Sequence, residues 1–276
     1  MRYFGIVKIM FRINKKALIA IGLVVALAVI IFADRLLKKA EPTAVPGINM
    51  EEQQLDQTQT QNSQGDIKKP YSGSVNPKAP TYSGRPLGEV RFGQGFNAPK
   101  ELIDKRKGDL KVLAAVLTSN PKGNGGVDDW IAVGVIKKFF NDYEGTKDAW
   151  EYAGVLYPAN ALSFANLGSL YGFYLKDPAK AEFNYRKAIQ NDPYQSGYYL
   201  GLADFYAQVD TAQKNKIPDV MLAGLQYVKD PNLLLYLAGY YKNIGDKANA
   251  VKYYQEVLKI APDQAGIQEE IDKLSN

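Results

Sequence analysis

The stretch that decides the fold lies near the C-terminus, at residues 231–262: PNLLLYLAGYYKNIGDKANAVKYYQEVLKIAP. Apolar residues recur every three or four positions on either side of Gly245, which predicts two amphipathic helices joined by a turn. The small residues Ala238 and Ala250 stand where the two helices would approach closely. We therefore expect an antiparallel helix pair here.

The same arrangement recurs towards the N-terminus with a period of 34 or 35 residues. Four units result, at about 127–160, 161–195, 196–230 and 231–264. A small residue recurs at one position of each first helix: Gly134, Gly168, Ala203 and Ala238. Because one helix pair cannot bury its apolar face alone, the stack is the expected folding unit. The expected fold class is all-α, an α-solenoid of about four helix pairs.

The third unit departs from the pattern. Its second helix carries Pro218, so we expect that helix to start near 218, after a loose loop around residues 211–216. Residues 263–275 are expected to form a terminal capping helix with a polar outer face.

The repeated pattern resembles the tetratricopeptide repeat family over roughly 127–264. The resemblance implies a scaffold whose first helices line a concave groove for partner proteins or peptides. By repeat position, the groove candidates are Ile131, Val135, Phe139, Ser169, Phe173, Leu200, Asp204, Gln208, Leu235, Lys242 and Asn243. Alternatively, the apolar candidates pack against the helix expected at 98–119 or belong to the core.

One subtype of this family binds acidic C-termini through a clamp of lysines, asparagines and an arginine. The present groove offers Lys138 and Lys242 but also Asp128 and Asp204, and its centre is apolar. We therefore expect hydrophobic or mixed peptide recognition rather than that clamp.

A membrane anchor is expected near the N-terminus. Residues 17–33 read ALIAIGLVVALAVIIFA, without a charge and with basic residues on both sides, which favours a transmembrane helix at 17–36. The alternative is a cleaved signal peptide, although the run is long for one. Five basic residues before the run against three after it predict a cytoplasmic tail at 1–16 and the rest of the chain outside the cytoplasmic membrane.

The anchor is followed by a polar stretch. Residues 37–97 are expected to be a disordered linker, because their polar composition cannot bury enough apolar surface to offset the entropy of ordering. Within it, PLGEVRFGQGF at 86–96 could instead form a short strand or dock on the domain. Residues 98–126 are expected to be a helical lead-in to the repeat domain at 127–276. In that lead-in, Leu110, Val112, Leu113, Val116 and Leu117 form one expected apolar stripe, and Gly108 is a possible break.

Composition excludes several classes of function. The chain of 276 residues contains no cysteine and no histidine, so thiol, disulfide, Cys/His zinc and histidine-based catalytic chemistry are excluded. The net charge of +5 arises from residues 1–40, whereas residues 127–276 carry an acidic excess, which argues against nucleic-acid binding. We expect no catalytic residue, cofactor, metal or small-molecule substrate. The many tyrosines of the repeats are expected to pack between helices with their hydroxyls reaching water.

These observations favour a membrane-anchored protein–protein interaction scaffold whose partners are other proteins or peptides, with the lipid bilayer contacted through residues 17–36. In layout the chain looks like bacterial inner-membrane proteins of this family that assist secretion, chaperoning or pilus and envelope assembly. The alternative is a structural envelope protein that self-associates or docks on the cell wall, without transient clients.

Overall fold

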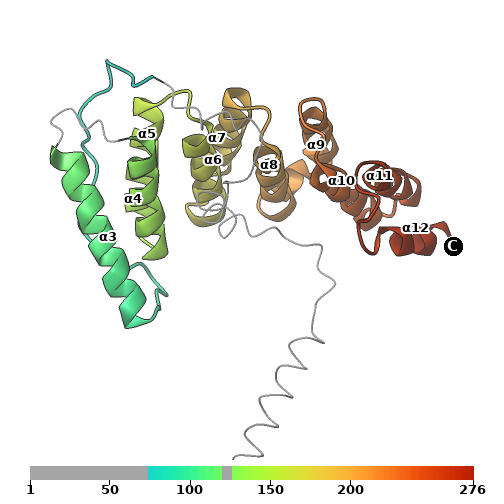
Figure 1. Ribbon diagram of the computed structural model, residues 1–276, viewed down its shortest axis with the longest axis horizontal. Coiled ribbons are helices and arrows are strands. Elements are labelled where there is room, and N and C mark those ends of the chain that lie inside the picture. The colour runs from blue at the N-terminus through green and yellow to red at the C-terminus, as the bar shows by residue number, and fades with distance from the viewer. Residues whose placement is uncertain (1–73, 120–125) are drawn as a thin grey trace, which may run out of the picture. The chain divides into compact units, whose positions relative to one another are not determined.

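The computed structural model describes residues 74–119 and 126–276, which all lie within the compact unit Gln61–Asn276 (Figure 1). The tail expected at 1–16, the transmembrane helix expected at 17–36 and most of the linker expected at 37–97 lie outside the described residues. Within the described part every regular element is a helix. None of these helices is long and apolar enough to cross a membrane.

Four helix pairs follow one another along the chain, each packed against the next (Figure 1). The first helices begin at Val127, Ala161, Ser196 and Pro231, which are the four unit starts expected from the spacing. The pairs are α4 (Val127–Phe139) with α5 (Tyr143–Leu156), α6 (Ala161–Ser169) with α7 (Pro178–Asn191), α8 (Ser196–Gln208) with α9 (Ile217–Leu225), and α10 (Pro231–Asn243) with α11 (Lys247–Ile260).

Local sequence explains where these helices begin and how closely they pack. The Asp177 carboxylate accepts a hydrogen bond from the Lys180 backbone N–H at 3.1 Å, and Pro178 occupies the first turn of α7. At Gly134, a Cβ atom would lie 2.0 Å from Nε1 of Trp150, so only glycine permits the approach of α4 and α5. The close contact expected from small residues at this repeat position is thus confirmed for the first pair.

Two of the pairs are irregular. α6 is extended by a π-helical turn, Leu170–Tyr174, in which the Leu175 N–H donates to the Leu170 carbonyl at 2.9 Å. In the third pair, a 3₁₀ helix, Thr211–Lys216, precedes α9, which begins at Ile217. The late start expected from Pro218 is therefore confirmed, and the expected loose loop is a 3₁₀ helix.

The buried tyrosines pack between helices as expected, but their hydroxyls differ from the expectation. Tyr206 accepts a hydrogen bond from Arg186 at 3.1 Å, and Tyr199 donates to the Pro193 carbonyl at 3.0 Å. Tyr171 also bonds to the Glu151 carboxylate. The Tyr206 and Tyr171 hydroxyls connect neighbouring helices instead of reaching water, and the Tyr199 hydroxyl is bonded to the connection between α7 and α8.

The C-terminal cap is the helix α12 (Ile267–Ser275). Ile267 and Ile271, one turn apart, are buried against the array, and α12 packs on α11. Across the same junction Lys242 of α10 pairs with Glu270. The expected capping helix is therefore present, and it begins four residues later than expected.

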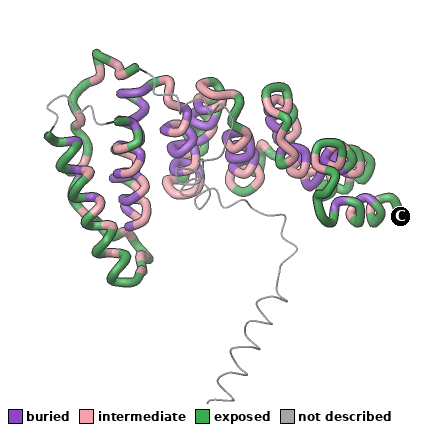
Figure 2. Tube along the Cα trace, in the orientation of Figure 1, coloured by how far each residue is buried: buried purple, intermediate pink, exposed green. Residues whose placement is uncertain are grey.

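The helix α3 (Lys100–Ser119) precedes the first pair and packs on α4. It passes through Gly108 without a break, so the possible break there is not present. Leu110, Ala114 and Leu117 are buried, but Val112 and Val116 are 65% and 49% exposed. Figure 2 shows α3 as a mostly exposed helix with few buried positions. The expected single stripe is therefore wrong: at 100° per residue, positions 112 and 116 point away from the buried face.

The expectation of a disordered linker is wrong for residues 74–97. This segment, here called the strap, runs along α5 from its C-terminal end to its N-terminal end. The Asn76 N–H donates to the Leu156 carbonyl at 2.7 Å, and at the other end the Gly93 N–H donates to the Phe140 carbonyl at 2.8 Å. Leu87 is buried in the same hydrophobic cluster as Trp130 and the inner face of α3. Strap and α3 together form the N-terminal cap of the array.

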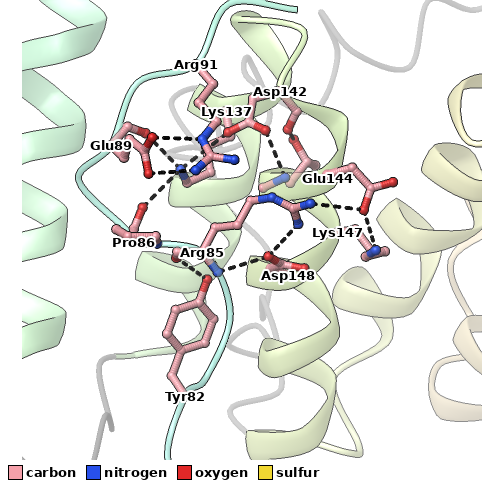
Figure 3. Close-up of polar contacts among 12 residues, drawn as sticks. Tyr82, Arg85, Pro86, Glu89, Arg91, Lys137, Asp142, Glu144, Lys147 and Asp148 are labelled. Carbon is pink, nitrogen blue, oxygen red and sulfur yellow. Dashed lines mark hydrogen bonds and ion pairs between the residues drawn. The ribbon is translucent and has the colours of Figure 1, made fainter.

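A buried lysine fixes the middle of the strap (Figure 3). Lys137 of α4 is 1% exposed, and its ammonium donates to the Glu89 carbonyl at 2.9 Å and lies 3.5 Å from the Asp142 carboxylate. Asp142 also caps α5 by accepting from the Gly145 N–H at 3.0 Å. Burial lowers the pKa of Lys137, opposed by the nearby Asp142. The strap thus supplies polar atoms that a buried ammonium requires.

A second polar contact holds the strap at the next turn of α5 (Figure 3). Arg85 donates to the Asp148 carboxylate through its guanidinium at 2.8 Å and through its backbone N–H at 3.0 Å. Tyr82 packs its ring against Trp130 and Tyr152. The segment is therefore ordered by contacts spread along its whole length.

Candidate protein-binding face

The first helices α6, α8 and α10 lie side by side, since α6 packs on α8 and α8 packs on α10. We call the side chains at the candidate repeat positions of these three helices the first-helix face. Its members are Ser169, Phe173, Leu200, Asp204, Gln208, Leu235, Lys242 and Asn243. The remaining first helix is α4, which opens the first pair, and its candidate side chains have different surroundings.

The three candidates on α4 are covered by the N-terminal cap. Ile131 is buried in the hydrophobic cluster that contains the inner face of α3, and Val135 and Phe139 pack against that cluster. The Phe139 ring also meets Phe96 of the strap at 5.5 Å between centroids. Ile131 is therefore core, and the partly buried Val135 and Phe139 pack against the core, which is the alternative that the sequence left open.

On α6 the candidates lie at the π-helical turn. Ser169 is half-buried and shares a hydrogen bond with the hydroxyl of Tyr185, a fully buried residue of α7 whose pKa burial raises. Phe173 is half-buried within the turn itself. Gly172 permits the close approach of α8, because a Cβ there would lie 2.8 Å from the Phe205 ring. Gly172 thus packs against α8, and the adjacent Phe173 stays half-buried on the first-helix face.

On α8 the central polar group is Asp204. Leu200, one turn earlier, is 6% exposed, so it contributes mainly to packing. The half-buried Asp204 carboxylate accepts a hydrogen bond from the Tyr236 hydroxyl of α10 at 2.9 Å. Burial raises the pKa of Asp204, while hydrogen bonds from the Tyr236 and Gln208 side chains oppose the shift. Gln208 itself is exposed at the end of the helix.

On α10 the candidates divide. Leu235 is half-buried and Asn243 is exposed. Lys242 is engaged by the C-terminal cap, since its ammonium pairs with Glu270 of α12, and this hydrogen bond raises its pKa. Lys242 is thus less available to a partner than its repeat position suggested.

Tyr236 is a member of the face that sequence reasoning missed. It is half-buried on α10 and is the hydroxyl donor to Asp204. Burial, and then the Asp204 charge, raise its pKa. The equivalent repeat position on α8 is Gly201. Because the residue type changes between units, the repeat pattern did not mark this position as part of the face. The sequence did offer one signal: a tyrosine at 236 on one first helix and an aspartate at 204 on the preceding first helix, which could form a hydrogen bond.

The first-helix face combines apolar and polar side chains. It offers apolar groups, amides, the hydroxyls of Ser169 and Tyr236, the Lys242 ammonium and the Asp204 carboxylate. Within residues 74–119 and 126–276, no group of three or more acidic side chains is arranged to hold a metal ion.

Comparison with known proteins agrees with this geometry. Residues 161–195 and 233–264 match the family described as Tetratricopeptide repeat. No curated protein gives a significant sequence match to this chain. The two matched segments cover the second helix pair, α6 and α7, and most of the fourth, α10 and α11. Two of the four pairs are thus similar to tetratricopeptide repeats. Such repeats suggest a role in binding other proteins.

Proposed function

We propose that this chain is a non-catalytic, membrane-anchored scaffold that binds partner proteins or peptides across the first-helix face. The observation that carries the proposal is the family match of 161–195 and 233–264. The two matched segments supply α6 and α10, the outer helices of the face, with α8 between them. Partner segments would lie over Phe173, Asp204 and Leu235.

The membrane part of the proposal rests on the sequence. Residues 17–36 would anchor the chain with the tail 1–16 in the cytoplasm, and residues 37–73 would connect the anchor to the strap. The array would then work outside the cytoplasmic membrane. Such a layout suits bacterial secretion, chaperoning, or envelope and pilus assembly.

The partner-binding function is tested by mild crosslinking in cells followed by co-purification. We compare the full-length chain with Gln208→Arg on the face and with Gln255→Arg, an exposed residue of α11 on the second-helix side. A discrete set of proteins that is lost with Gln208→Arg and retained with Gln255→Arg supports the proposal. Recovery of self-contacts or wall polymer alone would instead support a structural protein and overturn it.

The side of the membrane on which the array lies can be tested by labelling a single introduced cysteine, because the chain contains no other cysteine. In an Asn276→Cys variant, a membrane-impermeant maleimide should label intact cells or spheroplasts without lysis. Labelling only after lysis would place the array in the cytoplasm.

A further inference from the structure

Two acidic side chains of the array differ in their charge environment. Asp142, which is buried, lies 3.5 Å from the ammonium of Lys137. Asp204, which is half-buried on the first-helix face, is hydrogen-bonded by the neutral side chains of Tyr236 and Gln208. In the described part of the chain no lysine or arginine forms an ion pair with Asp204.

A partly buried carboxylate without a countercharge is unfavourable for the folded protein. Removing an ionised group from water lowers stability unless an opposite charge compensates it, and here burial raises the pKa of the group. A carboxylate can accept about four hydrogen bonds. Tyr236 and Gln208 supply donors to it, so capacity remains for a cationic donor from outside the chain.

The side chains near Asp204 on the first-helix face indicate which other partner side chains would fit there. Leu200 precedes it by one helical turn but is only 6% exposed, so it supports the face from within. Leu235 stands directly before its hydrogen-bond donor Tyr236, and Phe173 lies in the π-helical turn that extends the adjacent α6. Because the carboxylate is partly withdrawn from water, a charge pair with it is screened less than at an open surface.

We propose that Asp204 binds a lysine or arginine side chain of the partner segment, with apolar partner residues on either side of it. This inference rests on the proposed function, because it names the chemistry of the partner that the first-helix face recognises. Tyr236 acts as a positioning residue: its hydroxyl holds the carboxylate from α10 while the partner's cation approaches from the open side. Acidic segments are disfavoured by the same carboxylate.

The first test is a selection from a random peptide display library on the full-length chain in detergent micelles. Asp204→Asn and Asp263→Asn are screened in parallel, because Asp263 is an exposed acid of the α11–α12 turn and serves as the matched control. We expect peptides enriched in lysine or arginine between apolar residues for the wild-type chain and the control, and loss of that enrichment for Asp204→Asn. Peptides that bind the face without basic enrichment would overturn the inference but leave the proposed function standing. A selection that yields no binding peptide would contradict both.

The second test measures affinity with one selected peptide and its Lys→Gln or Arg→Gln derivative. Asp204→Asn and the peptide change should each weaken binding about 10- to 100-fold, as expected for a hydrogen bond between charged groups. Together they should weaken it little further, because both remove the same contact. Additive effects would overturn the inference.

A stability measurement separates this role from a structural one. Asparagine keeps an oxygen acceptor for Tyr236 and removes the charge, so the melting temperature of Asp204→Asn should equal or exceed that of the wild-type chain. A clear decrease, together with unchanged peptide affinity, would mean that Asp204 serves the fold alone and would overturn the inference.

Discussion

The two ends of the helix array are closed in different ways. At the C-terminal end one amphipathic helix, α12, covers α11 with two buried isoleucines and one partly exposed ion pair. At the N-terminal end the strap and α3 cover the first pair with a large aromatic and aliphatic cluster, and a buried lysine joins strap to helix. Both ends solve the same problem, since a terminal repeat has no neighbour to cover its apolar face.

The difference shows which kinds of cap can be recognised in a sequence. Ile267 and Ile271 recur at helical spacing, so α12 follows from periodicity. The strap has no period, because its backbone follows α5 and is held at separate points by Arg85, Lys137 and Tyr152. Composition alone therefore predicts disorder for a segment that is an integral part of the fold.

The largest effect is expected from removing the buried lysine. Lys137→Met should lower the free energy of unfolding by about 3–5 kcal/mol, because Asp142 would remain buried without a countercharge and the Glu89 carbonyl would lose its donor. Urea unfolding measures the change. The double variant Lys137→Met/Asp142→Asn, which removes both charges and keeps a capping side chain, should lose less. A loss below about 1 kcal/mol for the single variant would mean that the strap does not depend on this contact.

An apolar substitution at the C-terminal end should cause a smaller loss of stability, confined to the helices near the substitution. Ile271→Ala removes part of the buried contact of α12 and should lower stability by about 2 kcal/mol. Hydrogen exchange should increase in α12 and the end of α11, with α4 and α5 unaffected, because each repeat contacts only its neighbours. Increased exchange throughout the array would show that the two ends are coupled.

The ion pair of the strap should contribute an intermediate amount. Arg85 and Asp148 are only partly exposed, at 32% and 15% for their side chains. Arg85→Ala should therefore lower the free energy of unfolding by about 1 kcal/mol, the upper end of the range for exposed pairs. Limited proteolysis should then cut the strap faster than in the wild-type chain. Equal cleavage rates would contradict the assigned role of this contact.

The ion pair of the C-terminal cap should matter least. Lys242→Ala should change the free energy of unfolding by about 0.5 kcal/mol or less, because the pair is more exposed and Glu270 keeps Lys273 as a partner. Thermal unfolding at low and high salt provides the comparison with Arg85→Ala. A loss larger than that of Arg85→Ala would reverse the order proposed for the two ends.

The array itself could be predicted because its determinants are local and repeated. The unit starts at Val127, Ala161, Ser196 and Pro231 follow from the spacing of small and apolar residues. Pro218 similarly gave the late start of α9. The strap could not be predicted, because it depends on contacts between distant parts of the chain. The orientation of Val112 and Val116 was predicted wrongly although it follows from helical geometry, since positions 112 and 116 lie off the face of Leu110, Ala114 and Leu117.

The candidate face was predicted in part for the same reason. Repeat position identified Asp204 and Gln208, but it could not show that Ile131, Val135 and Phe139 are covered by the N-terminal cap. It also gave no indication that Tyr236 reaches across to Asp204, since this bond joins two units of different composition. Repeat position therefore identifies which face a residue occupies, and the cap decides whether that face is open.

The most direct test of the account uses single cysteines in this cysteine-free chain. Gln208→Cys on the face and Gln255→Cys on α11, both at exposed positions, are each coupled to the same thiol-reactive photocrosslinker and irradiated with the cell extract. We predict that Gln208→Cys captures a defined set of partner proteins and that Gln255→Cys does not. Equal capture at both positions, or capture only at Gln255→Cys, would contradict the assignment of the first-helix face as the binding surface.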